Sequence, residues 1–392
     1  MSPGVLLFIA SILIVVMIHE SGHFLVAKAF GFKATQFFVG FGPTVWSIQR
    51  GETEYGIKAL PLGGFVKILG MNPYEDIAVE DRERSYQAKP RWQRALLLLA
   101  GSGTHWIIAF VILVFAAMAI GFPTGAISNE IAAVQRGQGL ETPALAAGIR
   151  PGDRIVGVGG RATDSWPDIR DYIRTRAGEE AVFTVERGGV TRDLTVTLGQ
   201  AIFKDGRPVA YAGPGGDLRP ARAGEEKVGF LGVEPEPEYA TESLPGALAD
   251  SATRTWEISV MSVRGIGDVF GMVFGGELLD AITGEGRRQV DEGPLGLVGA
   301  SRIAGESVAR GQYLAFVGLI VSFTIFVGIM NLLPLPPLDG GHLAVLAWEG
   351  ITGKAVDLRR LIPVAAAVIS FFVLLFLAVL YLDLARPIRV PF

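Results

Sequence analysis

The sequence contains no cysteine and only four histidines among its 392 residues. The lack of cysteine excludes disulfides, thiolate catalysis and cysteine-ligated zinc, so any exported domain must be stabilised by its core alone. Charged residues make up only 19% of the chain, and a net charge of −4 gives no basic surface for a nucleic-acid partner. Half of the residues are hydrophobic and the mean hydropathy is positive, which indicates a membrane protein rather than a soluble enzyme.

Long hydrophobic runs, by contrast, are present. Four stretches are long and apolar enough to span a lipid bilayer, at about 5–30, 95–122, 313–338 and 361–384. We do not interpret the first as a cleaved signal peptide, because no basic region precedes it. Lysine and arginine concentrate in the first and third connecting segments, so the positive-inside rule predicts that these are cytoplasmic. Both termini and the long middle region are then extracytoplasmic, although Arg386 and Arg389 favour the opposite orientation weakly.

The first connecting segment loses helical periodicity between Gly31 and Gly70. Short β-type runs alternate there with glycine and proline, which predicts hairpins against the membrane face. An exposed hairpin edge can pair with an extended peptide, and the alternative is a purely structural plug.

The middle region contains a stretch, 143–160, that resembles the centre of PDZ domains. A helix near 166–176 and two strands, 181–186 and 191–198, follow in the expected order. PDZ domains bind an extended peptide by adding it as a strand to a sheet edge, but this domain can equally serve only as a bulky gate. Beyond it, Glu234-Pro-Glu-Pro-Glu238 is typical of a stiff linker.

The sequence therefore predicts a polytopic α-helical membrane protein with about four transmembrane helices, a membrane-associated β-hairpin region and one extracytoplasmic PDZ-like α+β domain. The expected parts are a first span (1–30), a cytoplasmic-side hairpin region and loop (31–94), a second span (95–122), the PDZ-like domain (123–200), a linker (201–243), amphipathic surface helices (244–312), a third span (313–340), a cytoplasmic loop (341–360), and a fourth span with a tail (361–392).

The first apolar stretch carries His19-Glu20-Ser21-Gly22-His23. Histidines four residues apart lie on one face of a helix and can bind one metal ion, with Glu20 beside them. Each ionisable side chain in a membrane helix costs about 2.5–3.5 kcal/mol or more, so three together require a common reason. A zinc ion with a water-activating glutamate supplies that reason.

A third ligand is expected from the third stretch, which ends in Asn331-Leu-Leu-Pro-Leu-Pro-Pro-Leu-Asp339. Its prolines cannot continue a helix, and broken backbone at membrane depth is tolerated only beside protein or a wet cavity. Taken alone, Asp339 is best interpreted as a helix cap. However, the first and third stretches both run inward, so His19, His23 and Asp339 all fall in the cytoplasmic half of the membrane. Two histidines, one carboxylate and an open water position are typical of catalytic zinc.

The remaining histidines, His105 and His342, also lie in or beside the apolar stretches. For His105 the sequence leaves two interpretations open, a metal or substrate contact and a hydrogen-bonding or packing role.

These motifs, in this order, resemble the site-2 protease family, and within it the bacterial PDZ-containing RseP-like group. The segments 40–43 and 59–70 match the family's membrane-associated hairpin region. The resemblance implies an intramembrane zinc metalloendopeptidase in which His19, His23 and Asp339 hold Zn2+ and Glu20 is the catalytic base. It also implies that Asn331 contacts the substrate.

The resemblance further implies partners and location. Substrates would be single-span membrane proteins of the anti-sigma-factor type, cut after an upstream site-1-type protease has trimmed them, in stress-response signalling. The protein would lie in the bacterial cytoplasmic membrane as a multi-pass protein, with its active site toward the cytoplasm and the PDZ-like domain outside.

The chain departs from the family pattern at one place: the family often has Ala-Gly-Pro-x-x-Asn in the second span, where this chain has Ala100-Gly-Ser-Gly-Thr-His105. Any role of that asparagine is therefore not carried over.

Two other classes of protein compete with the protease. A non-catalytic membrane adaptor would use the PDZ-like domain alone and would need no metal. A metal transporter would use His19, His23 and Asp339 as a transit site. The absence of internal repeats between the two halves of the chain disfavours the transporter.

Overall fold

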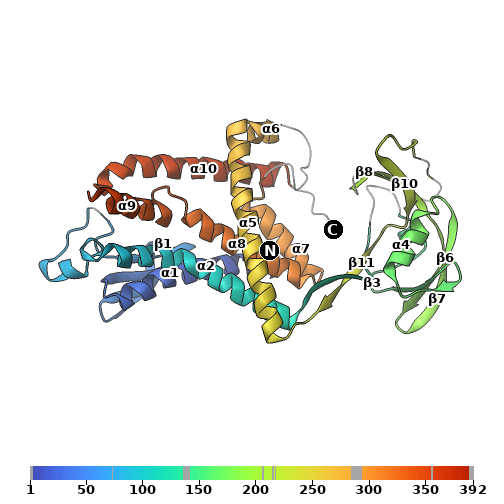
Figure 1. Cartoon of the computed structure of the whole chain (residues 1–392), viewed down its shortest axis with the longest axis horizontal. Helices are drawn as coiled ribbons and strands as arrows, with labels where there is room; N and C mark the ends of the chain where they lie inside the picture. The colour runs from blue at the N-terminus through green and yellow to red at the C-terminus, as the bar shows by residue number, and fades with distance from the viewer. Residues whose placement is uncertain are drawn as a thin grey trace. The chain divides into compact units, whose positions relative to one another are not determined.

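The computed structural model describes residues 3–72, 74–135, 142–204, 207–213, 216, 218–283, 294–354 and 356–387. They form two compact units (Figure 1). The first comprises Met1–Ile120 and Thr241–Pro391, and the second comprises Gly121–Ala240. The second unit is thus inserted in the sequence between two helices of the first.

Long apolar helices make up most of the first unit. Among the described residues, five are long and apolar enough to cross a membrane: α1 (Pro3–Ala29), α2 (Arg91–Ala119), α5 (Leu244–Gly275), α8 (Tyr313–Asn331) and Leu358–Ala385, in which a 3-10 turn leads into α10 (Ile362–Ala385). Four of them cover the apolar stretches expected from the sequence.

The fifth helix, α5, lies in the segment 244–312, where we expected amphipathic surface helices. The segment also contains α6 (Glu277–Thr283) and α7 (Leu297–Ala309). The count of four is therefore one short of the helices that qualify by length and composition. The signal in α5 was weak, since its mean hydropathy is 1.3 against 2.1 or more for the others. Figure 1 shows α5 running steeply across α8 and α10 rather than along them.

Small residues let the helices of the first unit approach closely. A Cβ atom on Gly22 of α1 would lie 2.5 Å from the carbonyl oxygen of Ala100 in α2. A Cβ on Gly4 would lie 2.7 Å from the Cα of Gly305 in α7. Close van der Waals packing is a main source of attraction between helices in lipid. These two contacts therefore fix α1 against α2 and α7.

The third apolar stretch breaks at its prolines. Helix α8 ends at Asn331, and after the turn 332–338 a new helix, α9 (Asp339–Thr352), begins. The turn is tight, because a Cβ on Gly340 would lie 2.2 Å from the carbonyl oxygen of Leu332. Within the expected loop 341–360, α9 continues to Thr352 and ends at Gly353, which has a φ of 71°.

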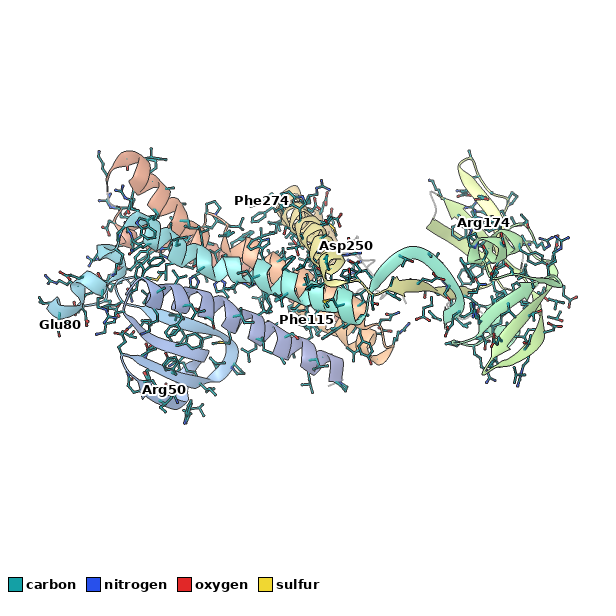
Figure 2. The ribbon with its side chains drawn as sticks, turned by 60° about the horizontal axis from the view of Figure 1, so that its bottom comes forward. Arg50, Glu80, Phe115, Arg174, Asp250 and Phe274 are labelled. Atoms are coloured by element: carbon teal, nitrogen blue, oxygen red, sulfur yellow. The ribbon has the colours of Figure 1, made fainter. Side chains whose placement is uncertain are left out.

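Two long strands, β1 (Ala34–Arg50) and β2 (Thr53–Ile68), form an antiparallel sheet beside α1 (Figure 2). Both strands bend, so that Phe37 of β1 pairs with Tyr55 and also with Val66 of β2. Four runs result, and 64–68 forms one outer edge while 44–50 forms the other. The strands lie in the segment where hairpins were expected.

The second unit consists of strands around two short helices, α3 (Pro143–Ala146) and α4 (Trp166–Arg174). Its larger sheet has the order β11-β3-β4-β6-β7 with β5 beside β4, and its smaller sheet has the order β10-β8-β9. Buried apolar side chains from both helices and the larger sheet form one core. The strands are β3 (Phe122–Val134), β4 (Arg154–Val158), β5 (Arg161–Ala162), β6 (Glu180–Arg187), β7 (Val190–Thr197), β8 (Gly199–Lys204), β9 (Arg207–Ala212), β10 (Glu225–Phe230) and β11 (Val233–Ala240).

Strands also occupy much of 201–243, so the expectation of a linker there is wrong. The run Glu234-Pro-Glu-Pro-Glu238 belongs to β11, in which Pro235 pairs with Ile131 and Pro237 with Ile127 of β3. Proline lacks an N–H and is tolerated in a strand that has a partner on one side only, and β11 is the outermost strand of its sheet. The second unit therefore extends to Ala240 instead of ending at 200.

A buried ion pair fixes the turn that precedes β4. The Asp153 side chain is 1% exposed and accepts hydrogen bonds from Arg187 Nε at 2.6 Å, from Arg187 Nη2 at 2.7 Å and from the backbone N–H of Arg150 at 2.8 Å. Burial alone would raise the pKa of Asp153, but the hydrogen bonds from Arg187 and Arg150 outweigh it and hold that pKa below its ordinary value.

Replacing Arg187 with Met should destabilise the second unit at neutral pH, because a buried carboxylate loses its partner. Since the folded-state pKa of Asp153 is lowered, its stabilising effect is complete above the ordinary aspartate pKa of about 3.9 and is lost as the pH falls below it. We expect the Tm of wild type and variant to differ at neutral pH and to converge in acid. The Tm at each pH is measured by heating the full chain in detergent and monitoring the unfolding of the second unit by its susceptibility to protease. An equal difference in Tm at both pH values would contradict this role.

Candidate metal centre

Helix α1 presents His19 and His23 on one face. The two residues are one helical turn apart, both side chains are buried, and their Nε2 atoms lie 3.1 Å apart. This face packs against α2 at a glycine. A Cβ on Gly101 would lie 2.1 Å from Nε2 of His23. The ring of His23 therefore occupies the space that any larger residue at 101 would fill.

Asp339 reaches the same point from another helix. It is the first residue of α9, and its Oδ2 lies 3.5 Å from Nε2 of His19 and 3.3 Å from Nε2 of His23. The proline break after Asn331 turns the chain so that α9 starts here. The three residues expected to hold a metal, far apart in sequence, are thus brought together.

The donor set fits a zinc ion. One nitrogen from each imidazole and one carboxylate oxygen all lie within 4.8 Å of one another, which in the described part of the chain is the one such group of at least three potential ligands. Oδ2 of Asp339 is buried, yet within the described residues it has no hydrogen-bond partner. A buried carboxylate oxygen without a donor is costly, and a cation bound by it and the two imidazoles removes that cost.

The outward nitrogens of both histidines are occupied by α2. Nδ1 of His23 donates to the carbonyl oxygen of Leu97 at 2.8 Å. Nδ1 of His19 lies 3.1 Å from Nε2 of His105. In both rings Nε2 is therefore the nitrogen that faces Asp339 and the other ring.

Glu20 lies between the two histidines in sequence and contacts the hairpin. Its Oε2 accepts a hydrogen bond from the backbone N–H of Val66 at 3.0 Å. Val66 belongs to the outer edge of the β1–β2 sheet. The sheet edge thus binds one of the two carboxylate oxygens of Glu20, and the other oxygen is not bound to Val66.

Of the other residues singled out from the sequence, Asn331 is the half-buried last residue of α8, before the turn that leads to Asp339. His342 lines a cavity of about 260 Å³ with Asn72, Tyr74 and Pro336. It is not a member of the metal-ligand group found among the described residues. His105 lies outside that group too, but in contact with His19.

Sequence reasoning missed Gly101 and Val66. Gly101 lies in the run 101–104 of small residues. Such a run is typical of close helix packing in membranes, but it does not indicate which side chain fills the space. Val66 acts through its backbone N–H, and no side-chain pattern signals such a contact.

A Gly101→Ala substitution should disrupt the candidate metal centre, because its Cβ would overlap the buried ring of His23. We expect the purified variant to lose most of its bound zinc, as measured by elemental analysis against protein concentration. Gly103→Ala is the matched control, since a Cβ there meets no atom within 4 Å and should leave the zinc content unchanged. Equal zinc content in the two variants would contradict the packing described.

Comparisons with known proteins identify the family of this chain. The family model for Peptidase family M50 matches residues 7–377. The chain is similar to zinc metalloprotease Rip1 of Mycobacterium tuberculosis, with 34% identity over 98% of both chains. Metalloprotease MmpA of Caulobacter vibrioides is 32% identical over 89% of this chain and 86% of its own. Zinc metalloprotease RasP of Geobacillus kaustophilus is 27% identical over 95% of each. A match across nearly the whole chain, with these relatives, means that the protein belongs to peptidase family M50, the site-2 protease family.

Proposed function

We propose that this chain is an intramembrane zinc metalloprotease that hydrolyses a peptide bond within the transmembrane segment of single-span membrane proteins. The observation that carries the proposal is the meeting of His19, His23 and Asp339 in a bundle of helices apolar enough to span a membrane. The names of the relatives Rip1 and RasP, both zinc metalloproteases, support the choice of metal.

Each residue of the centre has a role in this proposal. Nε2 of His19, Nε2 of His23 and a carboxylate oxygen of Asp339 hold the zinc ion. When bound, the ion polarises the scissile carbonyl and lowers the pKa of a bound water to about 7. Glu20 is the catalytic base: the carboxylate oxygen that Val66 leaves free accepts the proton of the attacking water, and the same oxygen returns it to the leaving amine.

The edge of the β1–β2 sheet is the proposed binding site for the unwound substrate. A transmembrane helix has its carbonyl groups in internal hydrogen bonds and must unwind before water can attack. The run 64–68 is an outer edge that already meets Glu20 through Val66. A peptide added to that edge as a further strand would lie beside the catalytic carboxylate. Asn331, at the end of α8, is proposed as an additional substrate contact.

Exposed apolar side chains support a membrane-associated position for the same sheet. Val45, Trp46 and Leu60 are 69%, 56% and 52% exposed. Several large apolar side chains exposed on one sheet favour a membrane or protein contact over water. We propose that the sheet dips into the cytoplasmic side of the bilayer.

Contacts at one end of the bundle support a topology of four spans. Helix α7 packs on the start of α1 at Gly4. Its own N-terminus meets the end of α10, where the backbone N–H of Gly299 donates to Asp383 at 2.8 Å. The start of α1, the end of α10 and α7 therefore lie on one side of the membrane, which the charge pattern assigns to the outside.

The segment containing α5 begins and ends on that same side. Before α5, the backbone N–H of Glu242 donates to the carbonyl oxygen of Ala117 at the end of α2, at 3.1 Å. After α5, the carbonyl oxygen of Ala281 in α6 accepts a hydrogen bond from Arg386, which follows α10. A segment that enters and leaves on one side does not cross. We therefore propose that α5 lies along or partly within the outer leaflet.

The second unit completes the proposal. It is assigned to the extracytoplasmic side as a PDZ-like domain that binds or excludes substrates. The proposed substrates are anti-sigma factors already trimmed by a site-1-type protease, in a bacterial cytoplasmic membrane. Its inserted position between α2 and α5, both of which contact the outer end of the bundle, supports this side.

Glu20→Gln is the test of the proposed function. The variant keeps the size of the side chain and its bond to Val66 but loses the base, so cleavage of a co-expressed single-span substrate should fall by a factor on the order of 10²–10⁴. Zinc content, measured on the same purified protein, should stay at the wild-type level. Asp339→Asn, which alters the ligand set, should lower both activity and zinc content. Unchanged cleavage by Glu20→Gln would leave the non-catalytic adaptor as the better interpretation.

The role of the sheet edge is tested at Val66. Val66→Pro removes the N–H that binds Glu20, whereas Val66→Ala retains it. We expect the proline variant to cleave at least about tenfold more slowly, as one positioning hydrogen bond to a charged group is worth roughly 1.5–3 kcal/mol. Cleavage assays on both variants, at matched expression and zinc content, provide the comparison. Equal rates for the two would show that Glu20 does not depend on this edge.

A further inference from the structure

The environment of His105 points to a function beyond packing. The side chain comes from α2, is 1% exposed, and places Nε2 at 3.1 Å from Nδ1 of His19. Helix α8 closes over its other side, since a Cβ on Gly328 would lie 2.8 Å from Cβ of His105. The ring is thus confined between α2 and α8 and directed at a residue of the metal centre.

The two imidazoles constrain each other's protons. Nε2 of His19 can bind a metal only through its lone pair, so the proton of a neutral His19 ring must be on Nδ1. That N–H needs an acceptor, and Nε2 of His105 lies at hydrogen-bond distance from it. His105 then carries its own proton on Nδ1, an atom with no hydrogen-bond partner among the described residues.

The same face of α2 serves the second histidine. Leu97, Gly101 and His105 recur every four residues and therefore lie along one face of the helix. The carbonyl oxygen of Leu97 accepts from Nδ1 of His23, Gly101 gives space for its ring, and His105 meets His19. One stripe of α2 thus positions both histidines of α1, with a backbone acceptor for one and a side-chain acceptor for the other.

We propose that His105 is a positioning residue of the zinc site: its Nε2 accepts the Nδ1–H of His19 and holds that ring in the tautomer and orientation that present Nε2 to the metal. The inference rests on the proposed zinc site and deepens it. Of the two interpretations left open by the sequence, it favours the second, as a hydrogen-bonding role, over a direct contact with the metal. Outer partners of metal-bound histidines typically contribute 10–100-fold to metal affinity.

Two substitutions of the full-length protein in detergent separate an acceptor from a space-filling side chain. His105→Gln retains an acceptor, because its Oε1 can occupy nearly the position of Nε2, whereas His105→Leu has none. Zinc affinity, measured by competition with a chromogenic chelator, should be within a few-fold of wild type for the Gln variant and about 10–100-fold weaker for the Leu variant. The absorption spectrum of the Co2+-substituted protein should change in the Leu variant only. His105→Met also lacks a strong acceptor, so we expect the same loss of zinc affinity. It replaces the Leu variant in the comparison if the Leu variant does not fold.

The outcomes are distinct. Wild-type affinity in the Leu or Met variant would overturn the role of His105 while leaving the zinc site intact. An equal loss in the Gln and Leu variants would also overturn it, since packing alone would then account for the effect. If wild type itself bound no zinc, the proposed function would fail, and the role of His105 with it.

Discussion

Three ionisable side chains meet at one point in a largely apolar bundle, and this constraint accounts for the arrangement around it. A polar or charged group at membrane depth is costly unless partners satisfy it. His19, His23 and Asp339 lie within 3.1–3.5 Å of one another. The outward nitrogens of the two rings meet α2. Helix α1 therefore needs α2 and α9 at close range, and Gly22 and Gly101 permit the close approach of α1 and α2.

The meeting of the three candidate ligands was predictable because their signal is unusual in sequence. Two histidines one turn apart within an apolar span, and an aspartate after a proline break, are costly in a membrane unless they share a cation. The structure brings all three together. The supporting contacts were not predictable. Leu97 acts through its backbone carbonyl and Val66 through its backbone N–H. The identity of the side chain at these positions therefore does not indicate the contact.

The fold was predictable where a single property decides it. Hydropathy located four apolar helices, and proline located the end of α8. Prediction from the sequence failed where contacts with neighbouring elements decide the structure. The prolines of 234–238 are typical of a linker, but at a sheet edge they lose no bond, and β3 provides the partner strand. Likewise α5 meets the length and composition of a span, whereas its orientation depends on where its two ends are held.

Helix α9 shows how the broken third stretch can still hold a candidate ligand in place. Asp339 is its first residue, where the helix dipole favours a carboxylate. Near its other end Glu349 pairs with Arg94 of α2 at 3.3 Å, and both side chains are nearly buried. A buried ion pair adds little net stability because desolvation offsets the attraction, but it penalises any other register. With α9 tied to α2 at Glu349 and facing α1 at Asp339, a shift of one helical turn would break both contacts, so the carboxylate position is set without a continuous helix.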